Sequence, residues 1–320
     1  MKIVREEAQS GKKIYDIREH PGEILIFDEN SKKIATLETK LVSSKVVSIF
    51  EKIKEATIGT FAIPVAEDLM KELLCTQIKA GSLRKADLFL MIYDRISPTT
   101  PDLGFSIKSM LGSSSTLLNA SGATNFVYKI VNKKVNAKGI NSIEGSSKVR
   151  DRIRKIEENG AKLEYLQMDS SDFEKNLRMI DTMFPQMIAE AAKFFYEGKG
   201  RTLEEVTASL HDDDVLKEKF RLSKNDYAYK IKSFLMNIAL GMTPVKEWDG
   251  FTRAHGGYII VKEDGELVCY HLYNRDQFQE YLFENTKFDT PSTSRHKFGS
   301  IYEENGEQFI KLNLQIRFIK

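Results

Sequence analysis

Two side chains of opposite charge, Asp87 and Lys108, have the types and the spacing that phosphodiester hydrolysis requires. Asp87 precedes the apolar run 88–93, which predicts a buried strand, and Lys108 lies in the segment 104–109, which predicts the strand paired with it. Because paired strands lie about 4.8 Å apart, the two side chains would converge. A carboxylate can hold a divalent cation beside a phosphate, and an ammonium group can orient water and stabilise the charge that builds on phosphorus. The pair therefore predicts metal-dependent cleavage of a phosphodiester, with Asp87 as the metal ligand and Lys108 as the catalytic cation.

This pattern follows the logic of the PD-(D/E)xK nuclease motif, with one departure at Ser106. A serine occupies the acid position of that motif, and its hydroxyl is a poor metal ligand. The missing acid would come from elsewhere, for instance from Glu72 on the preceding helix, or would be absent. The backbone carbonyl of Ile107 is a further oxygen ligand that this segment offers.

A second register of the same motif begins at Asp102, which follows Pro101 and gives the literal "PD". Only three residues then separate Asp102 from Ser106, too few for two antiparallel strands and a turn. We therefore prefer Asp87 and keep Asp102 as a second carboxylate in the loop. Asp94 is a weaker candidate, because an offset of seven residues from Asp87 places it on the opposite face of a regular strand.

The elements that must position these residues are predicted from hydrophobic periodicity and turn chemistry. The predicted strands are 24–27, 34–37, 88–93, 104–109, 258–261 and 267–273, and the predicted helices are 42–56, 64–79, 173–192, 202–210, 227–240 and 274–283. The Asp264-Gly265 pair predicts a hairpin turn. The tail 309–318 alternates apolar and polar residues, which predicts one half-buried strand whose polar, basic face meets water or DNA.

Composition excludes several classes of protein. The chain has 320 residues, 29% charged and 41% hydrophobic, which indicates a globular protein with one large domain or about two domains. A net charge of +2 excludes a polycation but allows a basic face. Two cysteines are too few for a disulfide framework or a Cys-rich zinc site. No segment reads as a signal peptide or a membrane span, so we expect a cytoplasmic protein.

One segment departs from this balance, because residues 129–162 hold ten basic and four acidic residues, a local net charge of +6. Two interpretations stay open for it. The cations could form a solvated linker or helix face, or they could form a patch that faces phosphates.

Several longer motifs carry a resemblance that covers the chain from about residue 2 to its end. They are Phe105-Ser106-Ile107-Lys108-Ser109, Leu111-Gly112, Ser115-Thr116-Leu117-Leu118-Asn119-Ala120-Ser121, Ala123-Thr124-Asn125-Phe126, Phe251-Thr252-Arg253-Ala254-His255-Gly256-Gly257, Asn285-Thr286, Thr290-Pro291-Ser292-Thr293-Ser294-Arg295-His296 and Lys311-Leu312-Asn313-Leu314-Gln315-Ile316-Arg317-Phe318. In this order they resemble the HpaII family of type II restriction endonucleases. The resemblance implies Mg²⁺-dependent hydrolysis of double-stranded DNA within a short palindrome, CCGG for the namesake, alongside a cognate DNA methyltransferase.

The resemblance also directs attention to polar residues that could contact DNA. Our candidates are Asn119, Ser121, Asn125, Arg253, His255, Arg295 and His296. Amides, hydroxyls and a guanidinium group can bind base edges or phosphates. The alternatives are a helix cap for the first three, ordinary histidines, and a polar turn around Arg295.

We therefore expect an α/β (α+β) fold, with a central mixed β-sheet flanked by helices. The expected regions are 1–148 as the catalytic core, 149–247 as a mainly helical subdomain, and 248–320 as a β-rich part that contacts DNA. A palindromic site is compatible with a homodimer, or with a monomer that nicks twice. The family resemblance also implies a Gly-Glu-containing helix ahead of 2–7, which this sequence does not include. The alternative expectation is thus a truncated or catalytically inactive DNA-binding relative.

Overall fold

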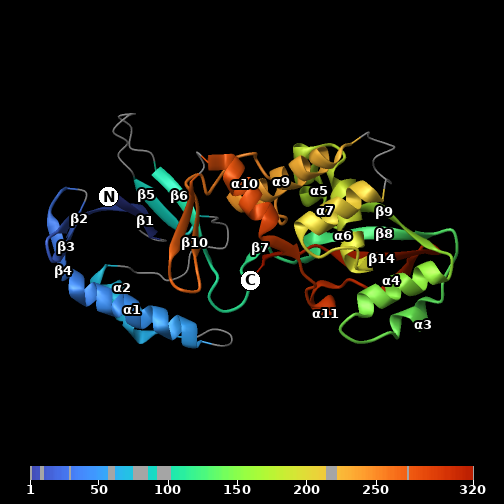
Figure 1. Cartoon of the computed structure of the whole chain (residues 1–320), viewed down its shortest axis with the longest axis horizontal. Helices are drawn as coiled ribbons and strands as arrows, with labels where there is room; N and C mark the ends of the chain where they lie inside the picture. The colour runs from blue at the N-terminus through green and yellow to red at the C-terminus, as the bar shows by residue number, and fades with distance from the viewer. Residues whose placement is uncertain are drawn as a thin grey trace. The chain divides into compact units, whose positions relative to one another are not determined.

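The computed structural model describes residues 2–7, 11–28, 30–56, 62–74, 86–91, 102–213, 222–271 and 274–319. They form two compact units (Figure 1). Unit 1 consists of Met1–Ser114 and Arg253–Asn274, and unit 2 consists of Ser115–Thr252 and Arg275–Lys320. The chain therefore leaves unit 1, builds most of unit 2 and returns. The three regions expected from the sequence divide the chain at other positions and stay a prediction.

Unit 1 contains a mixed β-sheet, in agreement with the predicted fold class. Its strands follow the spatial order β11-β10-β6-β5-β1-β2-β3-β4. Their bounds are β1 Lys2–Glu7, β2 Gly11–His20, β3 Glu23–Phe27, β4 Lys33–Glu38, β5 Leu88–Met91, β6 Asp102–Ser109, β10 Gly257–Val261 and β11 Leu267–His271. Strands β6 and β10 pair in parallel, whereas β5 pairs with β6 in the antiparallel direction. The predicted mixed sheet and the predicted antiparallel β5–β6 pair are confirmed.

Two helices of unit 1, α1 (Thr39–Glu55) and α2 (Pro64–Glu72), pack against each other. Lys45 of α1 donates a hydrogen bond to Glu72 of α2 over 2.6 Å. Helix α2 starts with a proline, whose fixed φ suits the first helical turn. The hairpin predicted from the Asp264-Gly265 turn is present as β10–β11, and Gly265 supplies the positive φ of +89° in that turn. The predicted strands 24–27 and 34–37 correspond to β3 and β4, which also pair in the antiparallel direction.

Unit 2 combines two smaller sheets with a helical layer (Figure 1). One sheet has the order β13-β14-β8-β9 and the other has the order β12-β15-β7. The strands are β7 Thr116–Leu118, β8 Asn125–Val131, β9 Lys162–Met168, β12 Thr286–Phe288, β13 Ile301–Glu304, β14 Glu307–Asn313 and β15 Ile316–Phe318. The helices are α3 Ala137–Asn141, α4 Lys148–Glu158, α5 Ser171–Ile180, α6 Phe184–Glu197, α7 Leu203–Asp212, α9 Lys224–Leu240, α10 Arg275–Glu284 and α11 Thr293–His296, with a 3₁₀ turn at Gly122–Thr124.

The core of unit 2 lies where α6 and α5 pack against β8, β9 and β14. Fully buried aromatic side chains fill this layer, among them Phe126, Tyr128, Phe173, Phe184 and Phe234. Helices α7 and α9 start with capping boxes at Thr202 and Ser223, which satisfy amide groups of the first turn. The periodicity that predicted these helices is therefore reinforced by local start signals.

Two predictions about unit 2 are wrong in detail. The helix expected over 173–192 is two helices, because Asp181 is extended (φ −163°) and Pro185 fits only the first turn of a helix. The tail expected as one half-buried strand is β14 and β15, which belong to different sheets. Its polar face is not a solvent face either, because Asn313 and Gln315 are buried. A central strand such as β14, which is paired on both edges and covered by α6, buries both sets of side chains.

A buried arginine ties three segments of unit 2 together. Arg152 of α4 is 3% exposed. Its guanidinium donates hydrogen bonds to the carbonyl oxygens of Asn141 (2.7 Å), Ile143 (2.8 Å) and Gly299 (2.7 Å). The fixed fork of an arginine side chain can satisfy several buried carbonyls at once.

We predict that Arg152→Met lowers the free energy of unfolding of unit 2 by about 3 kcal/mol, because it leaves buried carbonyl groups unsatisfied. Urea denaturation followed by circular dichroism measures this loss. Arg154→Met is the matched control, since Arg154 lies on the same helix but is 66% exposed. Equal losses for the two variants would contradict the structural role of Arg152.

Candidate active site

Asp87 lies at the start of β5 and is held against β6. Its backbone amide donates to the carbonyl oxygen of Phe105 over 2.7 Å. Its carboxylate accepts two hydrogen bonds on Oδ2, from the amide of Ile107 at 2.7 Å and from the hydroxyl of Ser106 at 3.1 Å. Asp87 is exposed, whereas Ser106 is buried. The carboxylate is therefore fixed in orientation by its neighbour strand but stays open to solvent.

Lys108 shares the face of β6 on which Ser106 lies, because the two residues are two positions apart on a strand. Burial lowers the pKa of Lys108, and the negative charge of Asp87 opposes this effect by raising it. The structure thus brings Asp87, Ser106 and Lys108 together as their spacing predicts. Their catalytic roles stay a prediction.

Tyr258 of β10 joins this cluster, although sequence reasoning did not single it out. It is the parallel partner of Ser106 and is 2% exposed. Its side chain is hydrogen-bonded to Ser106, and its ring centroid lies 5.7 Å from the Nζ atom of Lys108. Burial is the main reason why the pKa of Tyr258 is raised, so the phenol stays neutral. A neutral phenol beside an ammonium group adds a cation–π attraction that favours the charged lysine.

Two glycines allow β10 to reach this position. The amide of Gly256 donates to the carbonyl oxygen of Gly104 over 2.7 Å. A Cβ atom at Gly256 would lie 2.7 Å from the ring of Phe105, and one at Gly257 would collide with the carbonyl oxygen of Tyr270. Gly257 also has a φ of +115°, which favours glycine. Any side chain at these positions would therefore displace the strand that carries Tyr258.

The carboxylate of Asp87 has the chemistry that a hard divalent cation needs. Within the described residues its two hydrogen bonds both fall on Oδ2, so Oδ1 is left for a cation. Mg²⁺ typically takes one or two carboxylates and completes its shell with water and phosphate oxygens. The described residues contain no group of three or more His, Cys, Asp or Glu side chains that could hold a metal ion by themselves.

The other carboxylates that the sequence offers as candidate metal ligands have less well defined positions. Asp102 is the first residue of β6 and pairs with Met91 in the backbone register. Asp94 lies outside the described residues. The carboxylate of Glu72 binds Lys45. None of these observations assigns a second metal ligand.

The candidates for DNA contact are distributed over both units. Arg253 is exposed and His255 is half-buried in the segment that precedes β10 of unit 1. Asn119 of unit 2 is exposed, and Ser121 is half-buried, with its carbonyl oxygen bound by the amide of Asn313. Arg295 and His296 lie on α11, a short helix capped by Ser292 where the sequence suggested a loop.

Asn125 has a different environment, because its side chain is buried. Its amide nitrogen donates to the carbonyl oxygen of His296 at 3.0 Å and to Asp169 at 3.2 Å, and its amide oxygen accepts from Asn313 at 2.7 Å. The observed role of Asn125 is therefore to fasten α11 to β8, which holds the exposed Arg295 in place.

The chain is similar over its whole length to known restriction enzymes. A family model described as HpaII restriction endonuclease matches residues 1–318. The chain belongs to the HpaII restriction endonuclease family. The type II restriction enzyme HpaII of Haemophilus parainfluenzae is 41% identical over 320 residues, which is 100% of this chain and 88% of that protein. No solved structure matches.

Membership of the HpaII family confirms the prediction of a type II restriction endonuclease, which is a site-specific deoxyribonuclease. Among the described residues, no helix is long and apolar enough to cross a membrane. Tyr258 is the residue of the cluster that the sequence did not reveal, because its own run of apolar residues predicts only a strand. The sequence feature that could have pointed to Tyr258 is its position directly after Gly256-Gly257.

We predict that Asp87→Asn lowers the pKa of Lys108 further in the metal-free protein. The aspartate charge raises that pKa against the effect of burial, so its removal leaves burial unopposed. A pH titration of lysine Nζ signals by nuclear magnetic resonance, in the presence of a chelator, measures the change. Lys262, which is paired with Glu266, is the internal reference and should not move. An unchanged pKa of Lys108 would show that the two side chains are not electrostatically coupled.

Proposed function

We propose that this protein hydrolyses phosphodiester bonds of double-stranded DNA at CCGG in a Mg²⁺-dependent reaction. The observation that carries the proposal is the convergence of Asp87, Ser106 and Lys108 on two paired strands, in a chain that belongs to the HpaII family. The match in length and order to a type II restriction enzyme supports the class of substrate. CCGG rests on resemblance to the family's namesake.

Asp87 is the residue that would hold Mg²⁺, since Ser106 and Ile107 anchor its Oδ2 atom and no described residue donates a hydrogen bond to its Oδ1 atom. When bound, Mg²⁺ supplies Lewis-acid stabilisation of the phosphoryl oxygens. Ser106 contributes no metal ligand in this arrangement. Its hydroxyl instead orients the carboxylate, and this keeps a single rotamer of Asp87 ready for the cation.

Lys108 is the cation that would bind a non-bridging oxygen of the scissile phosphate and orient the attacking water. The side chain is partly buried, and an ammonium group acts more strongly on phosphate charge in such a site than in bulk water. Tyr258 positions Lys108 by its ring and Ser106 by its hydroxyl. The tyrosine thereby links the two halves of the candidate site without taking part in proton transfer.

Unit 2 supplies the candidates for sequence recognition in this proposal. Arg295 is exposed on α11, and a guanidinium can bind O6 and N7 of guanine together. His296, Asn119, Ser121, Arg253 and His255 stay in the proposed contact set, while the buried Asn125 acts through α11. A homodimer on the palindrome, a partner methyltransferase and a cytoplasmic location belong to the same proposal and rest on the family.

The second candidate is a DNA-binding relative that has lost cleavage. It is favoured by the serine in the acid position and by the lack of a three-ligand cluster among the described side chains. Incubation of a plasmid with the protein and Mg²⁺ separates the candidates. Discrete fragments support the proposed function, a smear indicates a nuclease without sequence preference, and uncut plasmid together with DNA binding supports the second candidate. Asp87→Asn should bind DNA and leave the plasmid intact.

We predict that Lys108→Ala lowers the single-turnover rate of cleavage by about 10³-fold, because it removes charge stabilisation that is used mainly in the transition state. Affinity for the same duplex, measured with Ca²⁺ in place of Mg²⁺, should change by less than about threefold. Lys262→Ala, in the same unit but in the β10–β11 turn, is the control. A parallel collapse of affinity and rate would make Lys108 a phosphate anchor instead.

We predict that Arg295→Ala weakens binding to a CCGG duplex more than binding to a scrambled duplex of equal length. A lost bidentate contact to guanine costs about 1–3 kcal/mol, or roughly 5- to 150-fold in affinity, on the cognate sequence alone. Fluorescence anisotropy with both duplexes in Ca²⁺ measures the difference. Equal losses would assign Arg295 to the DNA backbone, and no loss would leave it a surface residue.

A further inference from the structure

Two adjoining hollows in unit 2 lie apart in sequence from the candidate catalytic residues of unit 1. Their volumes are about 550 Å³ and 810 Å³, and they share the lining residues Ser146, Ser147, Arg150, Phe195 and Thr290. Three segments form the walls: the start of α4 with the turn before it, the end of α6 with the loop that follows, and residues 289–294, which include the first two residues of α11. We call this lining the α4–α11 pocket.

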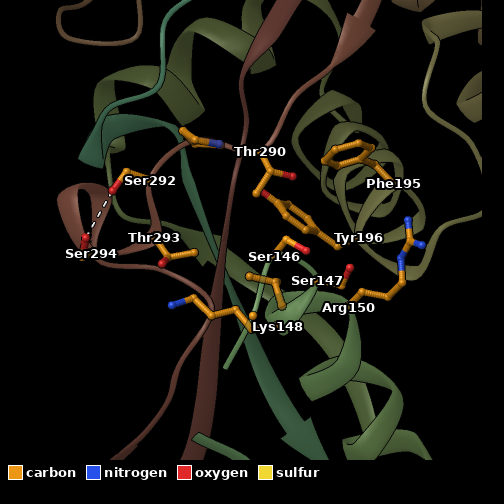
Figure 2. A pocket seen from close by; sticks show the side chains of 13 residues that line it. Ser146, Ser147, Lys148, Arg150, Phe195, Tyr196, Thr290, Ser292, Thr293 and Ser294 are labelled. Carbon is orange, nitrogen blue, oxygen red and sulfur yellow. Dashed lines mark hydrogen bonds between the residues drawn. The ribbon is translucent and has the colours of Figure 1, made fainter. Parts of the chain in front are cut away.

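The lining of the α4–α11 pocket is rich in hydroxyl groups (Figure 2). They belong to Ser146, Ser147, Thr290, Ser292, Thr293 and Ser294. Ser292 and Ser294 share a hydrogen bond of 3.2 Å, and Thr290 lies next to Tyr196. Hydroxyl groups reorient freely, so such a lining suits a ligand with several acceptor oxygens.

Arg150 gives this pocket a cation that is positioned but not neutralised. Its guanidinium packs against Gly198, because a Cβ atom there would lie 2.9 Å from the Cζ atom of Arg150. Gly198 ends α6 with a φ of +86°, so the glycine both turns the chain and makes room for the guanidinium. Arg150 forms no ion pair with any residue that the structure describes. Its positive charge is therefore available to a ligand.

The acids of the lining do not cancel this charge. Asp289 forms an ion pair with Arg317 at 3.0 Å. The carboxylate of Glu205 accepts hydrogen bonds from the backbone amides of Arg201 and Thr202, and these hydrogen bonds lower the pKa of Glu205. Both carboxylates are thus engaged elsewhere. An exposed arginine with hydroxyls around it and committed acids is typical of a site for an oxyanion, and the planar fork of arginine matches a phosphate.

We propose that the α4–α11 pocket binds a backbone phosphate of the DNA duplex, outside the scissile position. This inference rests on the proposed function and names the part of unit 2 that holds the DNA backbone. Thr293 and Ser294 line the pocket and also belong to α11, so the phosphate site is contiguous with the helix that carries Arg295. Phosphate binding here would fix the register in which Arg295 meets the bases.

The same observations divide the basic segment 129–162 into residues with different roles. Arg152 is buried and structural, while Arg154 and Lys155 pair with acids on their own helix. Lys148 lines the pocket but is bound to Glu144 at 3.0 Å. Arg150 lines the pocket and forms no ion pair with a described residue, so the test is built on its substitution.

The test compares Arg150→Gln with Arg154→Gln, a matched loss of one charge on the same helix. Fluorescence anisotropy gives the affinity for CCGG and scrambled duplexes in Ca²⁺ over a series of salt concentrations. For Arg150→Gln we expect equal losses on both duplexes and a fall of about 0.9 in the slope of log affinity against log salt, which corresponds to one phosphate contact. Arg154→Gln should behave like the wild type, and Arg150→Lys should keep most of the slope.

Several outcomes would overturn the proposal. They are identical behaviour of the two Gln variants, a loss confined to the CCGG duplex, and a wild-type protein that binds neither duplex. A second arm uses inorganic phosphate, followed by ³¹P line broadening. Arg150-dependent binding of inorganic phosphate without any effect of Arg150→Gln on DNA would assign the pocket to a free anion. If the wild-type protein binds DNA but does not cut it, the proposed cleavage activity is wrong. The comparison of Arg150→Gln with Arg154→Gln would still show whether the α4–α11 pocket binds a backbone phosphate.

Discussion

The parallel pairing of β10 with β6 is the constraint on which the candidate active site depends. It requires two backbones to approach so closely that Gly256 binds the carbonyl oxygen of Gly104, with no space for a Cβ atom beside Phe105. Once the strands are paired, Tyr258 has to lie next to Ser106. The environment of Lys108 follows from that pairing, whereas the orientation of Asp87 follows from its hydrogen bonds to Ser106 and Ile107 of β6.

Within this frame, the serine in the acid position has a physical explanation. Position 106 is buried and lies within hydrogen-bonding distance of Asp87. A second carboxylate at that distance would repel the first and would raise the pKa of one of the pair. A hydroxyl instead donates to Asp87 and fixes the orientation of its carboxylate. The serine at position 106 thus both removes an acid from the motif and orients the carboxylate of Asp87.

Part of the secondary structure was predictable from the sequence, because period-two and period-3.6 patterns and the Asp264-Gly265 turn act locally. Strands β1, β7, β8 and β9 and helices α3 and α4 were not predicted. The Asp87–Lys108 convergence was also predictable, since it needs only two neighbouring strands. The prediction of one half-buried strand over 309–318 was wrong, because burial on both faces of β14 depends on partners far away in sequence. Tyr258 and Arg150 were beyond local patterns for the same reason: their neighbours, Ser106 and Gly198, come from other segments of the fold.

The excursion of the chain through unit 2 has a consequence for synthesis on the ribosome. Ser114 and Arg253 bound this excursion, so Asp87 and Lys108 are translated long before the strand that flanks them. A nascent chain that has been translated as far as Thr252 contains Asp87 and Lys108 but does not yet contain β10 and β11. The order of translation therefore delays assembly of the candidate catalytic cluster until β10 and β11 have been made.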